Sequence, residues 1–165
     1  MAGRGVLSRR HGRVRVLIPR IERNAEIVWE GNVARGAGAI SAGTGAFTGL
    51  AFSVPTRIGR AEGNTSPEEL LAAAHGGCIT MSLASELTQA GTPPGRLEVT
   101  CRIVMDEVEG QGHQIVASHV DAVVAAGGLD ADALQGLLAK ADEGCPFSQL
   151  LRRAGAEVHV AARLA

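Results

Sequence analysis

Cysteine offers the clearest reactive chemistry in this chain, which contains three of them: Cys78, Cys101 and Cys145. The thiolate form of cysteine is the nucleophile, so the surroundings that set its pKa decide whether a given cysteine reacts. Cys101 lies on the apolar side of an alternating segment, and we expect it in the core. Cys78 and Cys145 stand in less ordinary contexts and are the candidates for chemistry.

Cys145 lies between Gly144 and Pro146. Proline favours the first position of a helix, so Cys145 is expected at the cap position of a short helix. Backbone N–H groups and the helix dipole favour a thiolate there. Gly144 is expected to end the preceding helix and leave the sulfur of Cys145 exposed. The alternative is a buried cap cysteine without chemistry.

Cys78 follows Gly76 and Gly77 in a stretch rich in Ala and Leu. Each glycine costs a helix roughly 1 kcal/mol relative to alanine, so both are expected to give clearance beside a reactive sulfur. Because Cys78 lies mid-helix, the dipole of its own helix cannot activate it, and a thiolate needs a cation from elsewhere. The alternative is a small buried apolar residue. Together, two reactive thiols at Cys78 and Cys145 could form a catalytic disulfide.

A metal site is not expected, because Cys and His do not occur in close pairs. The histidines are scattered along the chain, at His11, His75, His113, His119 and His159. We therefore predict chemistry by thiols alone, with no metal or other cofactor.

The element that must position Cys78 is a helix over 66–90. Ser66 can cap it, Pro67 suits its first position, and Glu69 completes a capping box. Gly91 can end the helix, and Pro93-Pro94 prevents it from continuing.

The remaining segments predict an α+β fold. A β meander is expected from strands at 25–30, 33–41 and 46–54, the last broken by Pro55. Residues 97–105 alternate between apolar and polar, as in a half-buried strand, and a turn at 109–112 joins them to a partner strand at 115–126. Asp130 caps a helix over 131–142, a short helix over 146–153 follows, and 156–162 forms a last strand. One copy of the chain would cover the long helix poorly, so we expect a tight homodimer.

Composition excludes several classes of protein. The 165 residues carry a formal net charge of -1, so the total charge does not favour nucleic acid or acidic lipid as a partner. Three widely spaced cysteines do not make a secreted disulfide framework, and no apolar run is long enough to span a bilayer. With no secretory signal, a cytoplasmic location is expected.

Residues 1–24 are expected to form an Arg-rich extension outside a single domain at 25–165. Seven arginines occur between Arg4 and Arg23, and Glu22 is the first acidic residue. A loosely docked arm, with a short strand at 14–18, is the simplest interpretation. A tether to a polyanion and a transit-like leader are alternatives that neither interleaved aromatics nor a strong amphipathic period supports.

Several segments resemble the OsmC/Ohr family of thiol peroxidases, and its OsmC branch in particular. The run Ser66-Pro-Glu-Glu-Leu-Leu-Ala-Ala-Ala-His-Gly-Gly-Cys78 is similar to the helix that carries the family's first cysteine. Gly144-Cys-Pro-Phe-Ser148 is similar to the motif of the second. Trp29-Glu-Gly31 and Pro55-Thr-Arg57 match the N-terminal half of the family. The resemblance covers about 25–163 and implies an α+β fold of antiparallel sheets around a long central helix, with intertwined homodimers and active sites at the dimer interface.

Site roles carry over by position as implications of this resemblance. Cys78 matches the peroxidatic cysteine and Cys145 the resolving cysteine. Arg57 matches the arginine that holds the thiolate, and Glu68 the acid that orients this arginine. Arg35 is a second candidate for the arginine, because the Ohr branch takes its arginine from the earlier strand region.

The spacing of Glu68 and Cys78 adds an inference about the dimer. They are ten residues apart on one helix, roughly 15 Å along its axis, so they cannot share an arginine within one chain. We therefore expect Glu68 and its arginine to reach the Cys78 of the partner subunit.

The expected function is thiol-dependent reduction of organic hydroperoxides, and of hydrogen peroxide as a further oxidant, in oxidative or osmotic stress defence. A dithiol would restore the enzyme, and the resemblance suggests a lipoylated protein. A stress or binding protein that keeps this fold without peroxidase turnover is the alternative. A nucleic-acid-associated protein that uses its Arg-rich arm is a more remote one.

Overall fold

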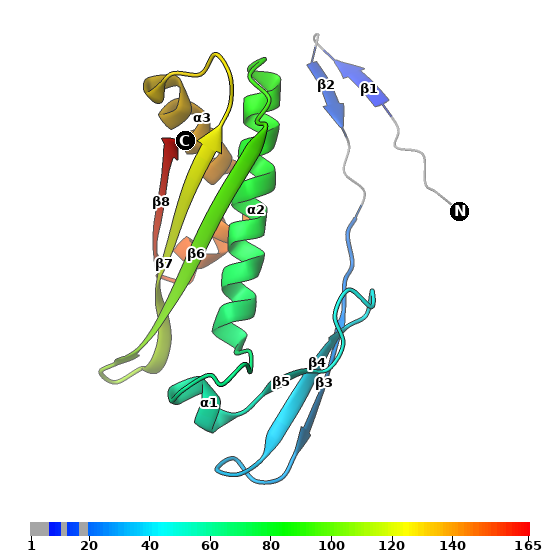
Figure 1. Cartoon of the computed structure of the whole chain (residues 1–165), viewed down its shortest axis with the longest axis vertical. Coiled ribbons are helices and arrows are strands. Elements are labelled where there is room, and N and C mark those ends of the chain that lie inside the picture. The colour runs from blue at the N-terminus through cyan, green and yellow to red at the C-terminus, as the bar shows by residue number, and fades with distance from the viewer. Residues whose placement is uncertain (1–6, 11–12, 17–19) are drawn as a thin grey trace. The chain divides into compact units, whose positions relative to one another are not determined.

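The computed structural model describes residues 7–10, 13–16 and 20–165 (Figure 1). They fall into two compact units, Met1–Asn64 and Thr65–Ala165. The boundary proposed from the sequence, between residues 24 and 25, is a different division and stays a prediction.

The N-terminal unit begins with an antiparallel hairpin of β1 (Leu7–Arg10) and β2 (Arg13–Val16). Strand β2 overlaps the short strand expected at 14–18, of which 17 and 18 lie outside the described residues. The remaining predictions for the extreme N-terminus, residues 1–6, also lie outside them.

A three-stranded antiparallel meander follows, in the order β3-β4-β5. Strand β3 (Ala25–Glu30) lies where it was predicted, whereas β4 (Ala37–Ala42) and β5 (Leu50–Phe52) are shorter than expected. The prediction of strand from residue 33 was wrong because the Asn32 side chain closes a turn, its oxygen accepting from the N–H groups of Ala34 and Arg35 at 3.1 and 3.0 Å.

Pro55 begins a helix instead of only ending a strand. The short helix α1 (Val54–Ile58) is capped by Ser53, whose hydroxyl accepts from the Thr56 N–H at 3.2 Å. Ser53 and Pro55 together make a helix start signal, so the prediction of only a strand break at Pro55 was wrong. Arg57 lies in the last turn of this unpredicted helix.

The C-terminal unit is built on the long helix α2 (Pro67–Gln89), within one residue of its predicted bounds. Ser66 accepts from the Glu69 N–H at 3.2 Å, and the Glu69 carboxylate accepts from the Thr65 hydroxyl at 2.8 Å. At the other end, Gly91 takes a φ of +81°. The Gly91 and Thr92 N–H groups then close the helix onto the carbonyls of Thr88 and Leu87.

A three-stranded sheet lies beside α2, with β6 (Arg96–Val108), β7 (Gly112–Ala125) and β8 (Glu157–Leu164) in that order. The predicted hairpin of β6 and β7 is confirmed, with an irregularity of register between Val104 and Met105. Strand β8 pairs in parallel with β7. The expectation of antiparallel sheets is wrong for this pairing, because a helical crossover returns the chain in the direction of β7.

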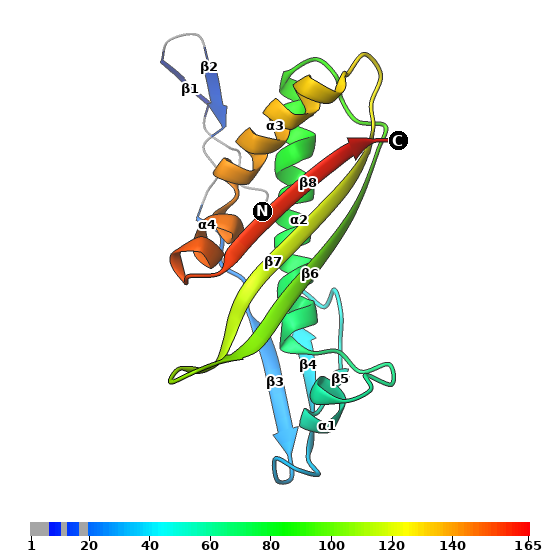
Figure 2. The same ribbon diagram turned by 90° about the vertical axis from the view of Figure 1, so that its left-hand side faces the viewer.

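That crossover consists of α3 (Ala131–Gly144) and α4 (Pro146–Arg153). Figure 2 shows α2 and α3 on the same face of the sheet. Aliphatic side chains of these two helices and of β7 form the main core, which consists of Leu83, Leu87, Ala122, Val124, Leu134, Leu138 and Ala141. A smaller buried cluster of Ile79, Val120 and Cys145 lies next to it. The α+β class is confirmed, and none of the helices in the described part of the chain is both long and apolar enough to cross a bilayer.

Candidate active site

The structure brings Cys78 and Cys145 together. The Cys145 thiol donates a hydrogen bond to the Cys78 sulfur, with 3.0 Å between the sulfurs. Cys78 lies in the middle of α2, and Cys145 is the residue that separates α3 from α4. Both are free thiols. Two thiols this close in one chain are in range to react with each other after one of them is oxidised.

The expected exposure of Cys145 is wrong, because its sulfur is buried. Helix α3 runs on to Gly144, and the side chain of Cys145 packs into the cluster with Ile79 and Val120. Cys78 is only half-buried and lies at the edge of the same cluster. A reagent arriving from solvent would therefore reach the sulfur of Cys78 before that of Cys145.

Helix α4 directs a backbone N–H at Cys78. Burial, the largest influence, and the adjacent Cys145 thiol both raise the pKa of Cys78, which stands at about 11. The Phe147 N–H in the first turn of α4 and the Ser82 hydroxyl hydrogen-bond Cys78 and act in the opposite sense. From the sequence, the N-terminus of this helix was predicted to favour a thiolate at Cys145 alone. Which of the two thiols the N-terminus of α4 favours depends on how α4 packs against α2, and no local sequence pattern predicts this packing.

The expectation that Gly76 and Gly77 give clearance beside a reactive sulfur is wrong for Gly76. A Cβ at Gly76 would lie 3.0 Å from the Cβ of Cys101, so this glycine lets α2 approach β6. A Cβ at Gly77 would have nothing within 4 Å. Cys101 packs against the Ile79–Val120–Cys145 cluster from the sheet, which agrees with its predicted place in the core.

His75 was one of several scattered histidines in the sequence, yet it is fully buried beside the thiol pair. Its Nδ1 is hydrogen-bonded to the Ser118 hydroxyl of β7, and its Nε2 to the Ser148 hydroxyl of α4, each at 2.8 Å. Burial lowers the pKa of His75, while the charge of Asp142 acts to raise it and that of Arg152 to lower it. The sequence signal for this residue was its spacing, one helical turn before Cys78.

The predicted charged groups occupy both units. Glu68 lies in the first turn of α2, and the helix runs without a break from there to Cys78, so the two remain about 15 Å apart along the axis. Arg57 lies on α1 and Arg35 in the turn between β3 and β4, both in the N-terminal unit. Their predicted roles at Cys78 stay predictions.

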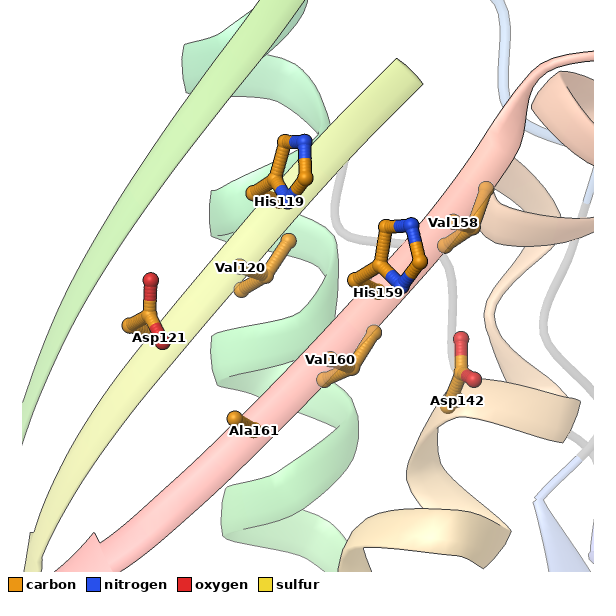
Figure 3. Close-up of a pocket in the computed structure, with 8 residues that line it drawn as sticks. All are labelled: His119, Val120, Asp121, Asp142, Val158, His159, Val160 and Ala161. Atoms are coloured by element: carbon orange, nitrogen blue, oxygen red, sulfur yellow. The ribbon is translucent and has the colours of Figure 1, made fainter.

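A separate pocket of about 360 Å³ lies along β7 and β8 (Figure 3). The imidazoles of His119 and His159 stack there with ring centroids 4.9 Å apart, and Asp142 lines it from α3. Neither Cys78 nor Cys145 lines this pocket. Within the described ranges, no three His, Cys, Asp or Glu side chains are grouped so that they could hold a metal ion.

Comparison with known proteins gives a family match over a range that contains both Cys78 and Cys145. The family model described as OsmC-like protein matches residues 59–161. The peroxiredoxin OsmC of Escherichia coli strain K12 is 35% identical over 132 residues, which are 80% of this chain and 91% of the relative. The organic hydroperoxide resistance protein of Xanthomonas axonopodis pv. citri is 31% identical over 103 residues, which are 61% of this chain and 70% of that protein.

Solved structures show the same fold. An organic hydroperoxide resistance protein OsmC from Legionella pneumophila superposes with a TM-score of 0.69 at 20% identity, covering 87% of this chain and 98% of the other. OhrB of Bacillus subtilis superposes with a TM-score of 0.61 at 24% identity, covering 86% and 98%. Identities this low establish only that the fold is shared. Family membership is established by the family model and by the relative that is 35% identical.

Proposed function

Because this chain belongs to the OsmC family of peroxidase-type enzymes, we propose that it reduces organic hydroperoxides with Cys78 as the attacking thiol and Cys145 as the resolving thiol. Hydrogen peroxide is a second, smaller oxidant for the same site. The observation that carries the proposal is the 3.0 Å separation of the two sulfurs, only one of which is accessible. Defence against oxidative or osmotic stress is the corresponding biological role.

The first step oxidises Cys78. Its thiolate attacks one oxygen of R–O–OH, the O–O bond breaks, and the sulfur takes up OH to become a sulfenic acid. The departing RO⁻ takes a proton and leaves as the alcohol. The Phe147 N–H and the Ser82 hydroxyl support the thiolate. Partly exposed apolar neighbours on α2, such as Leu71 and Ala74, suit an organic R group.

The second step forms the disulfide. The Cys145 sulfur attacks the sulfenic sulfur, an S–S bond forms, and the OH group leaves with the Cys145 proton as water. An external dithiol then reduces this disulfide in two thiol–disulfide exchanges and is itself oxidised to a disulfide. The family resemblance suggests a lipoylated protein for that task.

A homodimer would complete the site. With a pKa near 11, Cys78 is mostly protonated at neutral pH, so the site needs a cation that favours the thiolate. Arg57 is our first candidate and Arg35 the second, with Glu68 as the acid that orients the arginine from the partner subunit. Arginine suits the task because it stays charged and presents a fork of donors.

Uncovered apolar surface supports the dimer. Helix α2 presents Ala73, Gly77 and Met81 on its outer side, and Met81 is 71% exposed. Ile27 and Val28 on the edge strand β3 are 59% and 60% exposed. Large apolar side chains exposed on two separate elements are typical of surfaces that a partner covers.

Peroxide consumption with a dithiol tests the proposal. Wild-type protein should consume cumene hydroperoxide catalytically, and the Cys78→Ser variant should consume none. The Cys145→Ser variant should consume one equivalent for each chain and then turn over poorly. Catalytic consumption by Cys78→Ser, or unchanged steady-state turnover by Cys145→Ser, would remove the respective cysteine from the mechanism. A fold retained for binding alone would give no turnover in any of the three proteins.

A further inference from the structure

His75 connects the two elements that carry the reactive thiols. It lies three residues before Cys78 on α2, and its partner Ser148 lies three residues after Cys145 on α4. Three residues are close to one helical turn, so the His75–Ser148 bond runs alongside the contact between the two sulfurs. The 2.8 Å bond therefore spans the same pair of helices as the 3.0 Å contact between the thiols.

The histidine is itself held from its other side. Its second nitrogen is bonded to Ser118 of β7, so the imidazole links the sheet, α2 and α4 in one chain of hydrogen bonds. His75, Ser118 and Ser148 are all fully buried. Serine hydroxyls can donate or accept, so a neutral imidazole satisfies both contacts in either tautomer. Because these groups are buried away from water, breaking one of these hydrogen bonds would leave a polar group unpaired, which is energetically costly.

We propose that His75 is a positioning residue that holds the first turn of α4 against Cys78, so that Cys145 resolves the oxidised Cys78 rapidly. An ion pair from Asp142 on α3 to Arg152, at 2.5 Å, fixes the other end of α4. The inference rests on the proposed function for its kinetic consequence, whereas the placing of the two thiols can be measured without peroxide. The step that depends on it is the attack of the Cys145 sulfur on the Cys78 sulfenic acid, with loss of water.

Two conservative substitutions separate the two hydrogen bonds of His75. The amide of glutamine reaches about as far as Nε2 and can keep the contact with Ser148. The amide of asparagine reaches only about as far as Nδ1, so it can keep the contact with Ser118 and loses α4. Ser148→Ala removes the same contact from the other side. Ser85→Ala is the matched control, because Ser85 is an exposed α2 serine bonded to Gln89 and not to this network.

The first measurement follows the fate of oxidised Cys78. Each reduced protein receives one equivalent of cumene hydroperoxide, and samples quenched with dimedone and iodoacetamide are analysed by peptide mass spectrometry. Conversion of sulfenic acid to disulfide should slow at least about tenfold in His75→Asn and Ser148→Ala, since small misplacements of reacting groups are costly. His75→Gln should stay within about threefold of wild type, and Ser85→Ala should match it.

The second measurement needs no peroxide. Equilibration in glutathione redox buffers gives the effective concentration of the Cys78 thiol toward the Cys145 thiol. This effective concentration should fall about tenfold in His75→Asn and Ser148→Ala and should stay at the wild-type value in His75→Gln. The inference is overturned if His75→Asn and Ser148→Ala behave as wild type here, or if His75→Gln is as impaired as His75→Asn. If wild type forms no sulfenic acid with peroxide, the proposed function fails, and the redox-buffer measurement still decides the role of His75.

Discussion

A chain that lacks Cys78 should restore activity to a chain that lacks Arg57. The prediction follows from the continuity of α2, which keeps Glu68 about 15 Å from the Cys78 of the same chain. An arginine that is hydrogen-bonded to Glu68 reaches a second contact at most about 8 Å from that carboxylate, given hydrogen bonds near 3 Å on each side of a guanidinium about 2 Å across. We therefore expect the Glu68–arginine pair to serve the Cys78 of another chain.

The expected magnitude follows from two-fold symmetry. A heterodimer of Cys78→Ser and Arg57→Ala chains holds one site without its thiol and one site in which both groups are intact. Such a heterodimer should have about half of the wild-type turnover per dimer, because one of two symmetric sites works. Co-expression with two different affinity tags and tandem purification isolates the heterodimer, and cumene hydroperoxide consumption with a dithiol gives its activity. Each homodimeric parent sets the background.

The structure supplies a control with the opposite expectation. Cys78 and Cys145 meet within one chain, so a heterodimer of Cys78→Ser and Cys145→Ser chains should show no recovery of steady-state turnover. Absence of recovery in the Arg57→Ala pairing, from a heterodimer that has been isolated, would refute the argument for a shared site. If the Arg57→Ala homodimer is fully active, the experiment is repeated with Arg35→Ala, the second candidate for the arginine.

Four further predictions concern single side chains. Gly76→Ala should destabilise the protein by about 1 kcal/mol or more in urea unfolding, because its Cβ would meet that of Cys101 at 3.0 Å. Gly77→Ala should stabilise an isolated chain by about 1 kcal/mol through helix propensity. If α2 packs against α2 of the partner subunit at Gly77, the same variant should form a weaker dimer in sedimentation experiments. An unchanged dimer affinity would place that contact elsewhere. In the Arg57→Ala variant, the rate of Cys78 alkylation by iodoacetamide should rise with pH, with a midpoint near the pKa of about 11. In wild type this midpoint should lie at a lower pH, and equal midpoints in the two proteins would exclude Arg57 as the cation. Burial lowers the pKa of His75 below its ordinary 6.5. The contribution of His75 to the free energy of unfolding should therefore be complete above pH 6.5 and be lost as the pH falls toward the folded pKa, because the unfolded chain then binds the extra proton. The His75→Gln variant should show a flatter dependence of the unfolding free energy on pH than wild type, and identical slopes would contradict the prediction.

The elements that the sequence predicted well carry their own start and stop signals. Helix α2 has Ser66 and Pro67 at one end and Gly91 at the other, and its observed bounds agree within one residue. The hairpin of β6 and β7 is governed by alternation and a glycine turn, which are also local. Such features need no knowledge of the rest of the chain.

Two of the errors concern features that tertiary contacts decide. The parallel pairing of β8 depends on the path of the α3–α4 crossover, and the burial of Cys145 depends on packing against Ile79 and Val120. The shortening of β4 and the helix α1 have a local origin, because the Asn32 side chain closes a turn and Ser53 caps a helix. The pairing of Cys78 with Cys145 came from motif resemblance, since residues 67 apart are beyond the reach of any local pattern.

The division of the site along α2 also constrains the dimer. If Glu68 of each chain serves Cys78 of the other, two-fold symmetry requires the axis to pass beside the position midway between them, which is Ala73. Ala73 and Gly77 lie on the outer side of α2 and are small enough for two helices to approach closely. A larger side chain at Ala73 would separate each thiol from the charged pair meant to serve it. The Ala- and Gly-rich composition of the middle of α2 is therefore a condition for an arginine to reach the opposite sulfur.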